Sequence, residues 1–173
     1  MKRNITWIGL VLVGMLGLVG CEARPSLVRA PAANERTTLM LTPTLTAPSG
    51  LQAIVNETQA SDIHRIEIVP YLLTETHELR PLSRASGEPT DADAPDILKA
   101  VMSGEELNLK KAIALSGLRP NRDYKVVALA YTLAGELIAD PEISGIWINV
   151  KADDRPEAPT AIPLYLKPVP FYG

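Results

Sequence analysis

The sequence predicts an all-β domain, a two-layered antiparallel sandwich with one short inserted helix. Short apolar stretches recur along the chain, several of them with an every-second-residue pattern typical of half-buried strands. Proline is frequent, at 15 of 173 residues, which fits strands with proline-marked edges and turns. Aromatic residues make up only 5% of the chain. The domain is expected over residues 47–167 and is preceded by a signal and a tether.

Residues 1–20 have the layout of a secretory signal. Lys2 and Arg3 give a positive start, residues 5–18 are apolar and uncharged, and small residues lead into Cys21, the only cysteine. A plain signal peptide and an uncleaved transmembrane anchor are the alternatives. The uncharged stretch 4–21 is at the low end of the roughly 20 residues that a spanning helix needs.

The run Leu18-Val19-Gly20-Cys21 resembles the bacterial lipobox. The resemblance implies that the chain is cut before Cys21, that the thiol receives a diacylglycerol, and that the new N-terminus is acylated. Lipidation also explains a lone cysteine, which cannot form an internal disulfide. The implied location is the cell envelope, outside the cytoplasm, with the outer membrane favoured in a host that has one because Glu22 is not an aspartate.

Residues 21–46 are predicted to be the lipidated cysteine and a flexible tether, with prolines, alanines and mixed charges but no period. Within this stretch, residues 37–45 (TTLMLTPTL) alternate and are interrupted by Pro43. They are therefore interpreted as an edge strand or as more tether.

Three strands are predicted next, over residues 51–55, 63–73 and 79–82. The second has the clearest alternation, with these side chains on one face: Ile66, Ile68 and Leu72. Pro70 lacks a backbone donor, which predicts an edge or a bulge at that position.

A short helix is predicted over residues 95–103. Asp93 resembles an N-cap, Pro95 fits the first turn, Asp96 lies near the positive end, and Gly104 closes the unit. An every-second-residue pattern then follows from Leu107 to Leu115.

The second half of the domain is predicted to hold three more strands. Residues 124–131 alternate strictly, and residues 133–136 form a turn. Two strands are expected at 146–150 and 162–166, followed by a stiff proline-rich tail over 168–173.

Leu118, Pro120 and Tyr124 resemble the Leu-x-Pro-x-x-x-Tyr corner of fibronectin type III domains, and Ala130 and Gly135 keep the family's spacing. The resemblance implies an Ig-like sandwich in which the tyrosine ring enters the core and its hydroxyl bonds the backbone a few residues upstream. The early strands lack the family's usual tryptophan, and the helical insert is foreign to the family.

Charge and motifs argue against nucleic-acid binding and against catalysis. The formal net charge is −3, and lysines and arginines do not cluster. Ser61, Asp62 and His64 suggest a triad, but residues three apart in a strand largely face opposite sides, and no Gly-x-Ser-x-Gly elbow exists. A half-exposed strand histidine is expected instead, and no catalytic residue is assigned.

The acidic run at Asp91, Asp93 and Asp96 raises calcium binding as an alternative. Asp96 stands where an EF-hand loop needs glycine, and helix capping accounts for Asp93 and Asp96 without a metal. Zinc needs more cysteine and histidine than the chain has. No metal and no cofactor are expected, apart from the lipid on Cys21.

Trp147 and Tyr131 are the candidate contact residues. Each alternates with small or aliphatic residues that should fill the core, so that an exposed face could carry an aromatic platform for a sugar ring or a protein partner. Alternatively, both rings cover the second sheet's core or lie beneath the tail.

The expected function is that of a non-enzymatic, lipid-anchored envelope lipoprotein, with the sandwich as a binding or structural module for an envelope protein or a carbohydrate. The alternative is an accessory subunit of an envelope or surface-filament assembly. Such a subunit would dock a partner by strand addition at the edge containing Pro70 or at the tail. A hydrolase with an unrecognised site is a third class.

Overall fold

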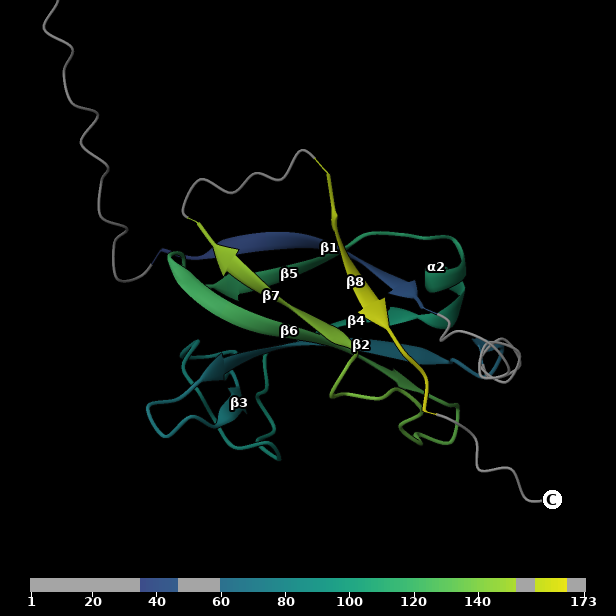
Figure 1. Ribbon diagram of the computed structural model, residues 1–173, viewed down its shortest axis with the longest axis horizontal. Helices are drawn as coiled ribbons and strands as arrows, with labels where there is room; N and C mark the ends of the chain where they lie inside the picture. The colour runs from purple at the N-terminus through teal and green to yellow at the C-terminus, as the bar shows by residue number, and fades with distance from the viewer. Residues whose placement is uncertain (1–34, 47–59, 152–157, 168–173) are drawn as a thin grey trace, which may run out of the picture. The chain divides into compact units, whose positions relative to one another are not determined.

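The computed structural model describes residues 35–46, 60–151 and 158–167, which form an all-β sandwich (Figure 1). The larger sheet has the order β3-β2-β6-β7, with β4 also paired to β2, and the smaller sheet has the order β5-β1-β8. The elements are β1 (Thr37–Leu45), β2 (Arg65–Leu73), β3 (Leu79–Pro81), β4 (Ala100–Ser103), α2 (Gly104–Asn108), β5 (Ile113–Leu118), β6 (Arg122–Tyr131), β7 (Gly145–Val150) and β8 (Thr160–Leu164).

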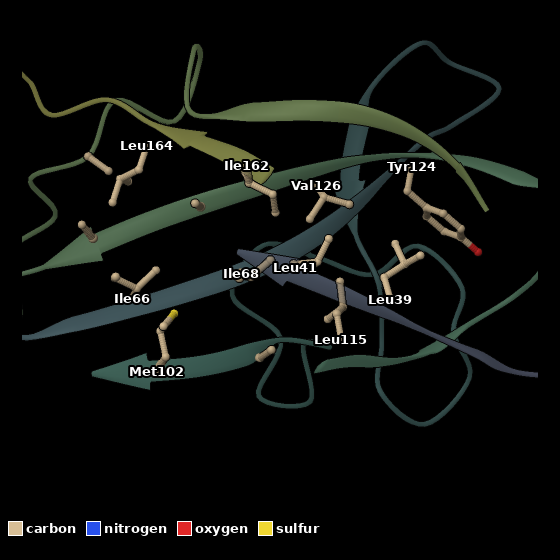
Figure 2. Packing of buried hydrophobic residues seen from close by; sticks show 14 of the residues in the cluster. Leu39, Leu41, Ile66, Ile68, Met102, Leu115, Tyr124, Val126, Ile162 and Leu164 are labelled. Carbon is tan, nitrogen blue, oxygen red and sulfur yellow. The ribbon is translucent and has the colours of Figure 1, made fainter. Parts of the chain in front are cut away.

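Strand β6 contributes four side chains to the core, and the predicted alternation of buried and outward-facing side chains along it is confirmed. Every second side chain, from Tyr124 to Ala130, is fully buried between the sheets. Figure 2 shows Tyr124 and Val126 in one packed layer with leucines of the smaller sheet, among them Leu41. The apolar period of the strand therefore fixes which face joins the two sheets.

The prediction for residues 37–45 was wrong in its placement of the strand. β1 is the middle strand of the smaller sheet, antiparallel to β5 and parallel to β8, and its Leu39 and Leu41 are buried. The sandwich therefore includes Thr37, ten residues before the expected start at 47, and the smaller sheet is mixed rather than antiparallel. Pro43 is accommodated because the ladder to β5 has already ended at Leu41.

Pro70 is not at an edge, so that prediction was also wrong. It is buried in β2 and lies opposite Val126 of β6. On the other side of β2, the pairing with β4 ends at Ile68 and the pairing with β3 begins at Tyr71. Pro70 therefore lies where one neighbouring strand gives way to another and no ladder donor is required.

The predicted helix over residues 95–103 does not form. Residues 100–103 are strand β4, in which Ala100 and Met102 are buried and Val101 is exposed. The helix α2 begins after Ser103, which accepts a hydrogen bond from the Glu106 amide while the Glu106 carboxylate accepts one from the Ser103 amide. This reciprocal capping box determines the start of the helix.

The Asp93 and Asp96 side chains do not cap a helix. Asp96 accepts a hydrogen bond of 2.5 Å from the Ser83 hydroxyl, and Asp93 is exposed. The every-second-residue pattern predicted from Leu107 to Leu115 does not form one strand. Leu107 belongs to α2, and β5 begins only at Ile113.

The remaining predicted strands form within the described residues, but the last one lies two residues earlier in the chain than the expected 162–166. Strands lie at 65–73, 79–81, 145–150 and 160–164, and Gly135 takes a positive φ of 83° in the turn after β6. The strand predicted at 51–55 lies outside the described residues.

A corner of backbone joins the two sheets after β8. The Asp140 amide donates to the Tyr165 carbonyl at 2.8 Å, and the Lys167 amide donates to the Ile138 carbonyl at 2.8 Å. Buried Ser144 lies at the same corner and bonds the Tyr165 backbone through its hydroxyl. The end of the smaller sheet is thereby tied to the connection between β6 and β7.

An arginine cluster holds the loop around Ser86 at the opposite end of β6. The guanidinium groups of Arg36 and Arg119 both donate to the Ser86 carbonyl, at 2.7 and 3.1 Å. Glu88 forms ion pairs with Arg119 and Arg122. These contacts fix the loop against the start of β1 and the start of β6.

Candidate functional site

The candidate binding surface is the outer face of the larger sheet, which points away from the core. Val69, Val127 and Leu129 form a small buried cluster at its centre. Ile97 and Leu137, from the connections before β4 and after β6, pack against this cluster. The centre of the outer face is therefore covered, and the open surface lies at the two ends of β6.

At one end of β6, three side chains lie in one row across neighbouring strands. Trp147 of β7 is in register with Lys125 of β6, and Lys125 is in register with Tyr71 of β2. Adjacent strands are about 4.8 Å apart, so one ligand can contact all three side chains. Trp147 is 55% exposed, whereas Lys125 and Tyr71 are partly buried. We call these three residues the Trp147 row.

The apolar surface continues beyond the Trp147 row. Leu73 follows Tyr71 by two residues on the same face of β2 and pairs with Leu79 of β3. Both leucines are exposed. The Lys125 ammonium donates to the Glu142 carbonyl at 3.3 Å, so the cation of the row is held by the connection that precedes β7. The row thus combines an aromatic ring, a cation and neighbouring aliphatic side chains.

Tyr131 lies at the other end of β6, so it does not share a platform with Trp147. The Tyr131 ring is half-buried, and the Arg65 guanidinium is 4.8 Å from its centroid, within the range of a cation–π interaction. Tyr131 is six residues from Lys125, or about 20 Å along the strand. The two predicted contact residues share a face, but no single sugar ring can touch both.

The buried carboxylate of Glu67 lies on the outer face between the two ends of β6 and is paired with two cations. Glu67 is 8% exposed, and its oxygens accept hydrogen bonds from the Lys99 ammonium at 3.0 and 3.1 Å. Arg65 lies 3.4 Å from the same carboxylate. Burial, with a smaller contribution from the Glu67 charge, raises the pKa of Tyr71 and of Tyr131. Both phenols therefore remain neutral hydroxyl groups at physiological pH.

The Tyr124 corner is structural rather than a binding site. The Tyr124 side chain is fully buried, and its hydroxyl donates to the Arg119 carbonyl and accepts from the Arg119 amide, both at 3.0 Å. Leu118 and Pro120 are buried on either side of Arg119. Burial raises the pKa of Tyr124. The three residues fix the crossover from β5 in the smaller sheet to β6 in the larger one.

The Ser61, Asp62 and His64 side chains are all exposed. The His64 backbone pairs on both sides, since its amide donates to the Tyr131 carbonyl and its carbonyl accepts from the Gly104 amide. His64 is therefore an exposed residue that immediately precedes β2, with its backbone bonded to neighbouring segments.

The acidic side chains around residue 91 form ion pairs and hydrogen bonds with neighbouring residues. Asp91 pairs with Arg80 at 3.1 Å, and Asp96 is bonded to Ser83. Over residues 35–46, 60–151 and 158–167, no three histidine, cysteine, aspartate or glutamate side chains are gathered as metal ligands. No helix of the described residues is long and apolar enough to cross a membrane.

Sequence reasoning missed Tyr71 and Lys125 as neighbours of Trp147. The two-residue period places Tyr71 on the face opposite Ile66 and Ile68, but it does not give the register of β2, β6 and β7. That register depends on the turns and on packing across the sandwich.

Cys21, the signal at 1–20 and the tail at 168–173 lie outside the described residues. Comparison of the chain with models of protein families, with curated proteins and with solved structures finds no significant match to any of them.

Proposed function

We propose that the chain is a lipid-anchored envelope protein whose Ig-like sandwich, similar to a fibronectin type III domain, binds another envelope protein without catalysis. The observation that carries this proposal is the Trp147 row, in which a 55% exposed indole lies in register with Lys125 and Tyr71. Tryptophan and tyrosine side chains are enriched among the residues that anchor protein interfaces.

A protein partner is favoured over a carbohydrate by the neighbours of the row. The exposed Leu73 and Leu79 extend the apolar surface on the side away from Trp147. Aliphatic side chains of this kind contact apolar protein surface, whereas a sugar ring stacks on aromatic faces.

The anchoring proposal rests on the lipobox-like run that ends at Cys21. A triacylated cysteine would hold the protein on a membrane without a spanning helix, because each buried CH₂ contributes about 0.8 kcal/mol. The Ig-like assignment rests on the Tyr124 corner, whose hydroxyl bonds the Arg119 backbone five residues upstream.

Two measurements test the proposal separately. Mass spectrometry of the N-terminal peptide of the native protein should show acyl chains on Cys21, and Cys21→Ala should abolish them and impair cleavage. A peptide without lipid mass overturns the anchoring proposal.

The binding proposal is tested by comparing Trp147→Ala with Leu133→Ala, a control at an exposed apolar residue in the turn after β6. Trp147→Ala should lose capture of an envelope protein that the wild type retains, corresponding to about 2 kcal/mol or more. The Leu133→Ala variant should behave as the wild type. Equal capture by all three proteins, or retention of an envelope glycan alone, would contradict the proposed protein-binding function.

A further inference from the structure

Lys125 differs from the other partly buried cations of the sandwich. The lysines and arginines that are partly buried in the described part of the chain are Lys99, Arg119, Arg122 and Lys125. Each of the first three pairs with a glutamate, either Glu67 or Glu88. Among the described residues, no carboxylate forms an ion pair with Lys125, whose ammonium donates to the Glu142 carbonyl instead.

The acidic residue next to Lys125 on the same face of β6 already has a partner. The Asp123 carboxylate accepts from the Asn149 amide at 2.7 Å, toward the end of β7. The Lys125 ammonium is bonded at the other end of β7, at 3.3 Å from the Glu142 carbonyl. An ammonium has three N–H donors, and the Glu142 carbonyl takes one of them. The others can therefore meet an acceptor on another molecule.

The position of Lys125 in the Trp147 row gives its charge a role in binding. Trp147 and Tyr71 flank it in register on the adjacent strands, and Trp147 is 55% exposed. A protein that covers the indole ring also removes water from the ammonium group. Loss of water around an unpaired charge is unfavourable, whereas an opposite charge on the partner compensates for it. The row therefore discriminates between partners by the group that each places opposite Lys125.

We propose that Lys125 determines the specificity of the Trp147 row, and that the partner is a protein that places an aspartate or glutamate carboxylate against its ammonium group. Apolar side chains beside that carboxylate would contact Trp147 and the exposed Leu73. The inference rests on the proposed function, because it gives the chemistry of the protein that this surface binds. Charge complementarity of this kind selects among partners more than it raises affinity.

Carbodiimide crosslinking of the full chain in its own envelope tests the proposal. The reagent joins a lysine amine to a carboxylate in contact with it as an amide, with loss of water. Mass spectrometry of the digested product should map this bond between Lys125 and an aspartate or glutamate of a second protein. Lys125→Arg should capture the same protein without a crosslink at 125, because a guanidinium keeps the charge but not the reactive amine. A captured protein that is never linked to Lys125, or a bond from Lys125 to an envelope glycan, overturns the proposal.

Capture of the crosslinked protein then measures the contribution of the charge. Lys125→Met keeps the aliphatic stem and should weaken capture at least tenfold, because the carboxylate of the partner loses its opposite charge. Lys167→Met is the matched control. The Lys167 ammonium also donates to a backbone carbonyl, that of Leu137 at 3.2 Å, but it lies away from the Trp147 row. The control should capture the protein as the wild type does.

The salt dependence separates a charge contact from a structural role of Lys125. Added salt should weaken capture by the wild type and by Lys125→Arg, and should affect the residual capture by Lys125→Met less. If Lys125 only held the connection before β7 through the Glu142 carbonyl, salt would affect all three proteins equally. Equal salt dependence, or equal capture by Lys125→Met and the wild type, overturns the proposal.

The two proposals can fail separately. A chain that captures an envelope protein through Trp147, without a crosslink or a loss of capture at Lys125, retains the proposed function and loses this inference. A chain that captures no envelope protein loses both.

Discussion

The buried Ser144 hydroxyl forms two hydrogen bonds with the backbone of Tyr165, accepting from its amide at 2.8 Å and donating to its carbonyl at 3.0 Å. Ser144 precedes β7 of the larger sheet, and Tyr165 follows β8 of the smaller one. One side chain therefore replaces a strand-to-strand ladder at the point where the two sheets meet.

Ser144→Ala should destabilise the domain by about 1–2 kcal/mol, because the Tyr165 amide loses its acceptor, whereas the Tyr165 carbonyl keeps the Asp140 amide as a donor. The free energy of unfolding in urea measures the effect. Ser116→Ala is the control, since the Ser116 hydroxyl bonds Thr38 on the surface and its loss should cost less than about 0.5 kcal/mol. Equal losses in the two variants would mean that the Tyr165 backbone finds other partners.

Tyr124→Phe should lower stability by about 1–3 kcal/mol, because the Arg119 amide and carbonyl both lose the phenol. The comparison variant is Tyr165→Phe, since the hydrogen bonds described for Tyr165 run through its backbone. Denaturation midpoints of the two variants distinguish the outcomes. An unchanged midpoint in Tyr124→Phe would show that the crossover from β5 to β6 does not depend on the hydroxyl.

The free energy of unfolding should decrease as the pH rises into the alkaline range. The pKa values of Tyr71, Tyr124 and Tyr131 are raised above 10.0, first by burial, so the folded state holds these protons when the unfolded state has released them. Their contribution is complete below pH 10.0 and is lost as the pH rises through the folded pKa values. Urea unfolding from about pH 8 to about pH 11 should show this fall, with a smaller slope in Tyr124→Phe. An equal slope in that variant would contradict the assignment to Tyr124.

Trp147 should report its exposure directly. After removal of residues 1–20 it is the only tryptophan, so its emission can be assigned without ambiguity. With 55% of the residue exposed, the emission should lie at long wavelength and iodide should quench it. A blue-shifted emission that iodide cannot reach at any concentration would place the ring inside the fold and remove the Trp147 row.

The sequence predicts the second half of the fold best. From Tyr124 to Ala130 the two-residue period is uninterrupted, and Gly135 marks the turn, so local pattern and tertiary packing agree. The predictions failed where proline was taken as a marker of a sheet edge. Pro43 and Pro70 lie inside their sheets, at positions where one neighbouring strand has ended, and that arrangement depends on pairings between distant segments.

The helix prediction failed because two sets of capping signals compete in the sequence. Asp93 and Pro95 have the composition of a helix start, but Ser103 and Glu106 have the reciprocal spacing of a capping box. For the candidate site, periodicity correctly placed Trp147 on the open face. It could not show that Tyr131 lies at the far end of β6, because the register of three strands is set by the complete sandwich.

The middle position of β1 has a consequence for the order of folding. Its neighbours β5 and β8 come from the second half of the chain, with Leu41 opposite Ile113 on one side and Thr160 on the other. Contacts between such distant segments form slowly, because a long loop must close before they contribute. The smaller sheet therefore cannot form until nearly the whole chain has been synthesised. In the exported protein that we propose, this delay would keep the first strand unfolded during passage across the membrane, and the sandwich would close only after the C-terminal strand had emerged on the far side.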